Sequence, residues 1–317
     1  MSQRILTGTS LRPWDGSPFQ AAVVAPMDSI RARAIRIAGF VAPQTVGKAA
    51  FSLFCTPTKV SSRGPAERRL EEKLTPLLST AEAQRVVTSG ATVQAYLWRT
   101  PRMPSRGRVL LLHGWRGQAL VMLMFVKPLL DAGFDCVAFD LPAHGQSTGR
   151  RLNLPLGADA VLAVGDALGP FTGIVTHSLG GLFAALAIEG GAPMTRRLHV
   201  ERLVLISSPN SLAGLTQNFA DNQRFSPRTP KSIYDEIGRI CGRSVNELNA
   251  GDFLLATGVP TLVIHEEQDE EVPISEAGAI LSRAGSTANL LTTNGLGHRR
   301  IVVMPNVVRA AVRHLSS

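Results

Sequence analysis

The stretch FTGIVTHSLGG, residues 171–181, decides the fold of this chain. An apolar run typical of a buried strand leads to His177, and Ser178 is followed by two glycines and the small-residue sequence FAALAIEG, which favours a helix. We predict a strand, a sharp turn with Ser178 at its apex, and a helix. Such a turn exposes the serine Oγ above the sheet and places a helix N-terminus beside any oxyanion that forms there.

The same alternation of strand and helix continues on both sides of this stretch. Strands are expected at 83–88, 93–98, 109–113, 134–140, 171–176, 203–206, 261–265 and 288–291, and helices at 120–132, 156–168, 179–190, 275–284 and up to 315. Continuous apolar strands that alternate with helices predict a mostly parallel sheet with helices on both faces. Right-handed crossovers would bring the C-terminal ends of the strands to one edge, where functional sites form.

Two further strand ends carry the partners that a nucleophilic serine requires. Asp269 lies in an acidic loop after the strand at 261–265, and His298 follows the last strand. A base must accept the serine proton, and a carboxylate must orient the base. The chain order Ser178, Asp269, His298 therefore predicts a serine–acid–histidine triad, with Glu267 and Glu270 as alternative acids. Taken alone, Ser178 could lie in an ordinary strand-to-helix connection, Asp269 in a solvated acidic run, and His298 in a polar loop.

A candidate oxyanion hole follows the strand at 109–113. The backbone N–H groups of Trp115 and of Leu179, the residue after the serine, could both point at a developing oxyanion. The Trp115 ring is a candidate for lining the acyl pocket, and packing is the alternative. One residue departs from the G-x-S-x-G pattern: Thr176 stands where the first glycine is expected, and its side chain would crowd the approach of strand and helix.

Residues from about 80 to 317 resemble the α/β-hydrolase fold superfamily. The resemblance is carried by HGW at 113–115, DLPAHGQS at 140–147, THSLGG at 176–181, VIHEEQDEEVP at 263–273 and GLGHRRI at 295–301. It implies the α/β-hydrolase fold and a serine hydrolase without metal or cofactor, whose triad is Ser178, Asp269 and His298. It also implies a structural role for the stretch containing Asp140, His144 and Gly145. Glu266 stands where members of the superfamily commonly have glycine.

Three parts of the chain are expected. Residues 1–80 form an N-terminal helical extension and linker, similar to that of poorly characterised bacterial members, and residues 81–317 form the hydrolase domain. Within the extension, residues 1–19 are expected to be irregular, 21–40 and 46–55 to be helical, and 61–80 to be a polar linker with a charged helix. A short helical cap is inserted at about 209–253, where Phe219, Phe225 and Tyr234 are candidates for substrate binding, or only for closing the sheet edge.

Composition and charge exclude several classes of protein. The chain has 317 residues, 44% hydrophobic and 18% charged, which is typical of a globular protein. Residues 1–60 carry +5 of the net charge of +9, and no nucleic-acid-binding pattern accompanies it. No signal-like or membrane-spanning apolar segment is found, and Cys55, Cys136 and Cys241 form no disulfide or metal pattern, so a cytoplasmic location is expected.

The function predicted from these features is hydrolysis of a carboxylic ester or thioester in a small-molecule acyl substrate. Perhydrolase, C–C hydrolase, amidase and acyltransferase chemistry use the same triad and stay open as alternatives. A non-catalytic binding scaffold is a third alternative. The basic helices at 21–55 either pack on the main domain or make weak contact with an anionic membrane surface. No metal or phosphate-binding motif is present, and the sequence indicates neither the substrate nor the oligomeric state.

Overall fold

A computed structural model describes residues 5–7, 29–57 and 65–317. Within these residues the strands form one nine-stranded sheet with the order β1-β9-β8-β7-β6-β4-β5-β3-β2. β2 and β3 are antiparallel to their neighbours and all other pairs are parallel, which confirms the expected mostly parallel sheet. The strands are β1 Ile5–Thr7, β2 Glu82–Val87, β3 Thr92–Trp98, β4 Arg108–Leu112, β5 Asp135–Phe139, β6 Gly173–His177, β7 Arg202–Ile206, β8 Thr261–Glu266 and β9 Ala288–Asn294.

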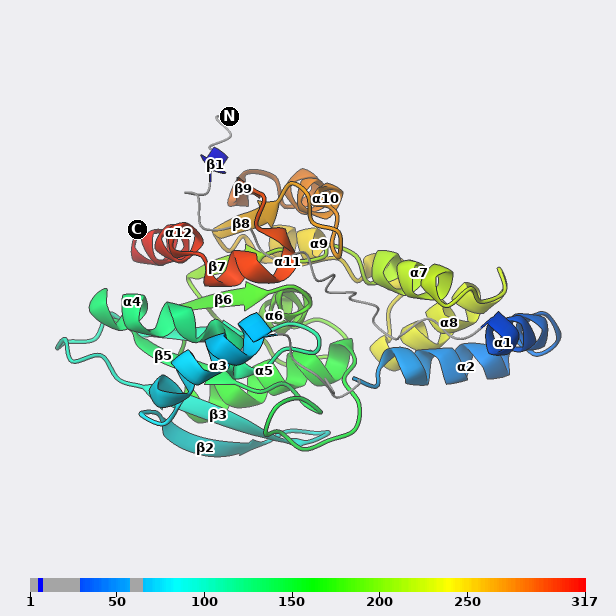
Figure 1. Cartoon of the computed structure of the whole chain (residues 1–317), viewed down its shortest axis with the longest axis horizontal. Coiled ribbons are helices and arrows are strands. Elements are labelled where there is room, and N and C mark those ends of the chain that lie inside the picture. The colour runs from blue at the N-terminus through cyan, green and yellow to red at the C-terminus, as the bar shows by residue number, and fades with distance from the viewer. Residues whose placement is uncertain (1–4, 8–28, 58–64) are drawn as a thin grey trace.

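Figure 1 shows the sheet extending from β9 at the top of the view to β2 at the bottom. The direction of strand addition reverses between β4 and β6, which are adjacent although β5 separates them in sequence. Leu112 pairs with Thr176 at this point, so Gly114 and Ser178 each follow two residues after the pair. Because such a reversal separates the crossovers on either side, it leaves a crevice at the C-terminal ends of the strands.

Alternate strand residues face opposite layers of helices, as the pleat of a strand requires. In β4, Leu110 and Leu112 belong to the core under α5, α6, α9 and α10, while Val109 and Leu111 belong to the core under η1, α4 and α12. The bounds of these helices, together with those of α3 and α11, are α3 Pro65–Leu78, η1 Ala119–Phe125, α4 Val126–Asp131, α5 Leu154–Leu168, α6 Gly180–Glu189, α9 Ala250–Thr257, α10 Ile274–Ala284, α11 Gly297–Arg300 and α12 Pro305–Ser316. Both faces of the sheet are therefore covered, as expected.

The N-terminal helices pack on the inserted helices. α1 (Ser29–Val41) and α2 (Pro43–Phe54) lie beside α7 (Leu212–Asn222) and α8 (Thr229–Cys241) at one end of the molecule (Figure 1). The rings of Phe54 and Phe219 have centroids 5.2 Å apart. α9 begins inside the expected insertion but packs on α6 and α10, so the projecting part of the insertion is α7 and α8.

Several expected features differ in detail or cannot be compared. The helix expected at 120–132 begins as the 3₁₀ helix η1 and becomes α-helical only at Val126. β1 lies in a segment for which no regular structure is expected. Residues 8–28 and 58–64, which include the expected start of the first helix and part of the linker, lie outside the described residues. Of the helices that the structure describes, none has the length and apolarity needed to cross a membrane.

Candidate active site

Ser178 occupies the apex of a tight turn between β6 and α6. Its φ is 54°, in the left-handed region that L-residues rarely adopt, and its N–H donates to the Ile206 carbonyl oxygen at 2.8 Å. Gly180 permits the turn to pass close to the end of β4, because a Cβ there would lie 2.6 Å from the His113 carbonyl oxygen. The side chain of Ser178 is half-buried.

Thr176 is accommodated in this turn. Its side chain is completely buried, and its Oγ1 donates a hydrogen bond to the Val204 carbonyl oxygen of the neighbouring strand at 3.1 Å. The hydroxyl is therefore not left without a partner in the core, which would be costly. The departure from glycine at this position does not prevent the turn around Ser178 from forming.

The three residues of the expected triad meet at one edge of the sheet. The Nε2 atom of His298 is 3.0 Å from the Oγ of Ser178, and its Nδ1 atom is 2.8 Å from the Oδ2 of Asp269. Since a carboxylate only accepts, Nδ1 carries the proton and Nε2 accepts from the serine hydroxyl. Asp269 and His298 are 6% and 7% exposed, so this hydrogen-bond chain is shielded from water except at Ser178.

Asp269 is held as an ionised acceptor. Its Oδ1 accepts hydrogen bonds from the N–H groups of Glu271 and Val272, both at 2.9 Å. Burial by itself raises the pKa of a carboxyl, but the hydrogen bond and charge of His298, together with the Val272 N–H, outweigh burial and hold the pKa of Asp269 below its usual value. The alternative acids are elsewhere: Glu267 accepts from the Asn294 side chain, and Glu270 is exposed.

The two expected oxyanion donors belong to residues next to the Ser178 turn. Trp115 follows Gly114, which lies against Ser178, and Leu179 immediately precedes helix α6. Among the described residues, neither backbone N–H has a hydrogen-bond acceptor. Both donors are thus available for an oxygen beside Ser178, where the N-terminus of α6 adds its partial positive charge.

Two neutral histidines and one carboxylate shape the loop that carries Trp115. His113 accepts from the Leu141 N–H at 3.0 Å, and His144 accepts from the Arg116 N–H at 3.0 Å. Burial lowers the pKa of His113 and of His144 to about 4. Asp140 accepts from the N–H groups of residues 119 and 146 at 2.7 Å and 2.8 Å. This part of the structure agrees with the structural role implied for Asp140, His144 and Gly145.

His177 supports the backbone of His298. Its Nε2 atom donates to the His298 carbonyl oxygen at 2.8 Å, and the two rings have centroids 4.9 Å apart. Burial, with a smaller contribution from the charge of His298, lowers the pKa of His177 to about 3. His177 therefore donates this hydrogen bond as a neutral imidazole at neutral pH.

The four residues considered for substrate binding all have contacts within the protein. Phe219 is 2% exposed and lies 5.7 Å from Phe225, ring centroid to ring centroid. The hydroxyl of Tyr234 donates to the Ala213 carbonyl oxygen at 3.3 Å. Trp115 is half-buried and makes an edge contact with His144 at 5.5 Å. A role for these four residues in substrate binding stays a prediction.

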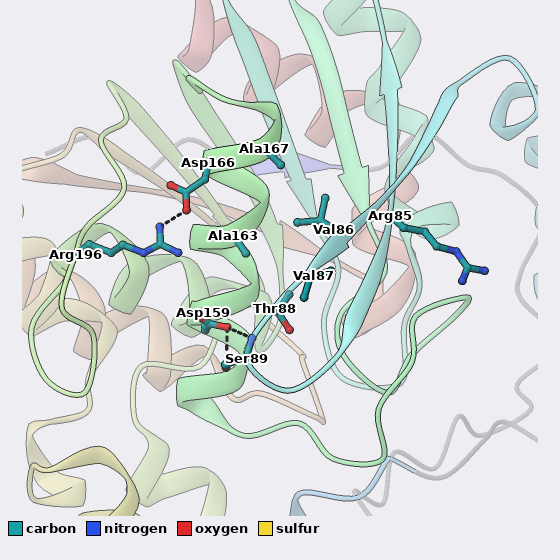
Figure 2. A pocket seen from close by; sticks show the side chains of 10 residues that line it. All are labelled: Arg85, Val86, Val87, Thr88, Ser89, Asp159, Ala163, Asp166, Ala167 and Arg196. Carbon is teal, nitrogen blue, oxygen red and sulfur yellow. Dashed lines mark hydrogen bonds and ion pairs between the residues drawn. The ribbon is translucent and has the colours of Figure 1, made fainter.

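A cavity of about 440 Å³ lies away from the triad, between the edge strand β2 and helix α5 (Figure 2). Its acidic side chains already have partners. Asp159 accepts from the N–H and hydroxyl of Ser89, and Asp166 forms an ion pair with Arg196 at 2.7 Å. A smaller hollow near the triad is lined by α7 and by Glu271 and Val272. No group of side chains suited to holding a metal is found in the described part of the chain.

The roles of three residues around the triad could not be inferred from the sequence. Glu271 places its Oε2 3.8 Å from the Nε2 of His298, and Glu266 and His177 hold the loop of the histidine by hydrogen bonds. The only local signal was the position of Glu266, a charged residue where members of the superfamily commonly have glycine. The Thr293 hydroxyl and the two backbone N–H groups that bind its carboxylate are 27–30 residues away, so the sequence alone could not assign them.

The family model described as "Alpha/beta hydrolase family" matches residues 109–311. That range contains Gly114, Ser178, Asp269 and His298 and covers more than half of the chain. Among curated proteins, no match to the sequence was found.

Several solved structures share the fold. Est1E from Butyrivibrio proteoclasticus with bound ferulic acid has a TM-score of 0.57 and 20% identity, over 74% of this chain and 100% of that chain. The esterase Pf2001 from Pyrococcus furiosus has a TM-score of 0.57 and 17% identity, over 82% and 98%. The thioesterase domain from the curacin biosynthetic pathway has a TM-score of 0.52 and 18% identity, over 75% and 99%.

Proposed function

Because the chain belongs to the alpha/beta hydrolase family, we propose that it is a serine hydrolase that cleaves carboxylic ester or thioester bonds. The observation that carries the proposal is the continuous chain of hydrogen bonds from the Oγ of Ser178 through His298 to Asp269. Such a chain activates a hydroxyl that is otherwise a weak nucleophile at neutral pH.

In the first half of the reaction, the Oγ of Ser178 attacks the acyl carbonyl carbon while the Nε2 of His298 accepts its proton. The carboxylate of Asp269 stabilises the imidazolium cation through the hydrogen bond from Nδ1. The N–H groups of Trp115 and Leu179 donate to the oxyanion. His298 then protonates the leaving alcohol or thiol, and an acyl-serine remains.

In the second half, water attacks the acyl-serine and His298 again accepts a proton. The tetrahedral intermediate collapses, the acid leaves, and the proton returns to the Oγ of Ser178. The same two N–H groups stabilise both oxyanions, since both form on the same carbonyl oxygen. The half-exposed position of Ser178 supports this step because water must reach the acyl group.

The chemistry of the structural neighbours supports the choice of bond. An esterase and a thioesterase domain share the fold, and a third neighbour was solved with ferulic acid bound. Their low identity makes this support general: it concerns the class of acyl bond and not a particular acyl chain.

A fluorophosphonate probe tests the proposal directly, because it reacts only with activated serines. We expect the wild type to be labelled, Ser178→Ala to be unlabelled, and His298→Ala to be labelled far more slowly. Ester or thioester hydrolysis should fall by roughly 10⁴–10⁶-fold in both variants. A panel of nitrophenyl esters, acyl thioesters and amides would rank the bond types.

Two exposed residues provide matched controls: Ser282→Ala and His199→Gln should leave labelling and hydrolysis unchanged. A well-folded wild type that is not labelled would contradict the proposal and favour a binding scaffold. Labelling without cleavage of any ester or thioester would retain the activated serine but reject the proposed bond class.

A further inference from the structure

Glu266 is a completely buried carboxylate that the catalytic scheme does not use. It is the last residue of β8 and pairs in the sheet with Thr293 of β9. Its Oε1 accepts from the Gly295 N–H at 2.7 Å. Its Oε2 accepts from the Thr293 hydroxyl at 2.7 Å and from the Leu296 N–H at 3.1 Å. A buried charge is tolerated only when hydrogen bonds of this kind compensate its lost hydration.

All three donors belong to the segment that leads to His298. Gly295 and Gly297 in this segment have φ of 79° and 68°, and glycine restricts the backbone less than any other residue. The segment therefore depends on external contacts to keep one conformation. Leu296, two residues before His298, is bound directly to the carboxylate of Glu266.

The backbone of Glu266 is hydrogen-bonded to the loop that carries Asp269. The Glu266 carbonyl oxygen accepts from the Asp269 N–H at 3.3 Å, and the adjacent Glu267 N–H donates to the Thr293 carbonyl oxygen at 2.9 Å. Glu266 thus contacts the loop of Asp269 through its backbone and the loop of His298 through its side chain.

From this geometry we propose that Glu266 is a positioning residue that sets the placement of His298 relative to Asp269 and Ser178. The inference rests on the proposed function. A carboxylate is required because it offers two acceptor oxygens to donors on two sides. A glutamine has one acceptor oxygen and one NH₂ group, so at least one of the Gly295 and Leu296 N–H groups would face another donor. The loop would then shift away from that group.

The test compares Glu266→Gln with two controls. Glu267→Gln removes a half-buried neighbouring carboxylate that binds the same loop only through the Asn294 side chain, at 2.9 Å. Ile280→Val removes a methyl group from the buried side of α10 and lowers stability without touching either loop. For each variant we would measure kcat and KM on the best ester, the rate of fluorophosphonate labelling and the melting temperature.

We expect Glu266→Gln to lower kcat and the labelling rate by roughly 10–100-fold, because a displacement of a catalytic group by about 1 Å has an effect of that size. KM should stay within about twofold, since substrate contacts are not altered. Both controls should keep the wild-type kcat. If Glu266 had a purely structural role, its replacement would lower activity only in proportion to the loss of stability. Ile280→Val shows how large that effect is.

Thr293 provides a milder pair of variants if Glu266→Gln does not fold. Thr293→Val removes one of the three donors and should lower kcat several-fold with KM unchanged, whereas Thr293→Ser keeps the hydroxyl and should resemble the wild type. If Glu266→Gln and Thr293→Val both keep the wild-type kcat, the inference is overturned. The proposed function would still stand in that case, provided that the wild type is labelled by the fluorophosphonate. An unlabelled, inactive wild type would overturn both.

Discussion

Gly114 lies so close to Ser178 that a Cβ at this position would be 2.6 Å from the serine Cβ and 2.9 Å from the His177 carbonyl oxygen. The contact joins the ends of β4 and β6 at the point where strand order reverses. The next residue, Trp115, supplies one of the two proposed oxyanion donors. The placement of that donor therefore depends on the absence of a side chain at position 114.

At the scale of single residues, we predict that Gly114→Ala will lower kcat by about 10²–10³-fold. The added methyl group must push the loop away from Ser178, and loss of one oxyanion donor has an effect of this size. Gly214→Ala is a matched control, because the same methyl group in α7 would meet no atom closer than 3.7 Å. Ester hydrolysis checks the prediction, and equal kcat in the two variants would show that the Trp115 N–H does not act in the reaction.

At the scale of elements, the closest helix contact outside the sheet layers is between α2 and α8. A Cβ at Gly47 of α2 would overlap the Cβ of Ser232 in α8. The contact between Phe54 and Phe219 continues the same interface toward α7. The N-terminal helices and the inserted helices thus form one packed unit built from two separate parts of the sequence.

We predict that Gly47→Ala will destabilise the protein by about 1–3 kcal/mol, because overpacking outweighs the helix propensity of alanine. At an open helical site the same substitution stabilises a helix by about 0.5–1 kcal/mol. Gly278→Ala in α10 is such a site, with no atom within 4 Å of the added Cβ. Urea unfolding of both variants checks the sign, and stabilisation by Gly47→Ala would mean that α2 and α8 are not closely packed in solution.

At the scale of the whole molecule, three buried histidines make stability depend on pH. Burial lowers the pKa of His113 and His144 to about 4 and that of His177 to about 3, below the ordinary value of 6.5. As the pH falls below about 6.5, these residues take up protons in the unfolded chain but not in the native protein. Acid therefore favours unfolding, and each histidine lowers the free energy of unfolding by about 2 kcal/mol at pH 5.

We predict a marked decrease in the free energy of unfolding between pH 7 and pH 5. Asp140 acts in the opposite direction, because burial raises its pKa and the native state takes up its proton first. His144→Gln should reduce proton uptake on unfolding by about one near pH 5. Urea unfolding at several pH values measures this slope; a wild-type stability that is flat from pH 7 to 5 would contradict the prediction.

The sheet and the order of the candidate triad could be predicted because both are local properties of the sequence. Each triad residue follows the end of an expected strand within a few residues, as in THS at 176–178, and parallel strands bring their C-terminal ends to one edge. The eight expected strands were found as β2 to β9, and the structure brings Ser178, Asp269 and His298 within hydrogen-bond distance.

The sequence by itself thus determined the layered fold, the turn at Ser178 and the order of the residues around it. Only the tertiary structure decided that α2 packs on α8, that Phe219 faces Phe54, and that the carboxylate of Glu266 holds the loop of His298. The physical reason is the range of the interactions. Periodicity and turn preferences act over a few neighbouring residues, whereas these contacts join segments whose approach depends on how the whole sheet brings its loops and helices together.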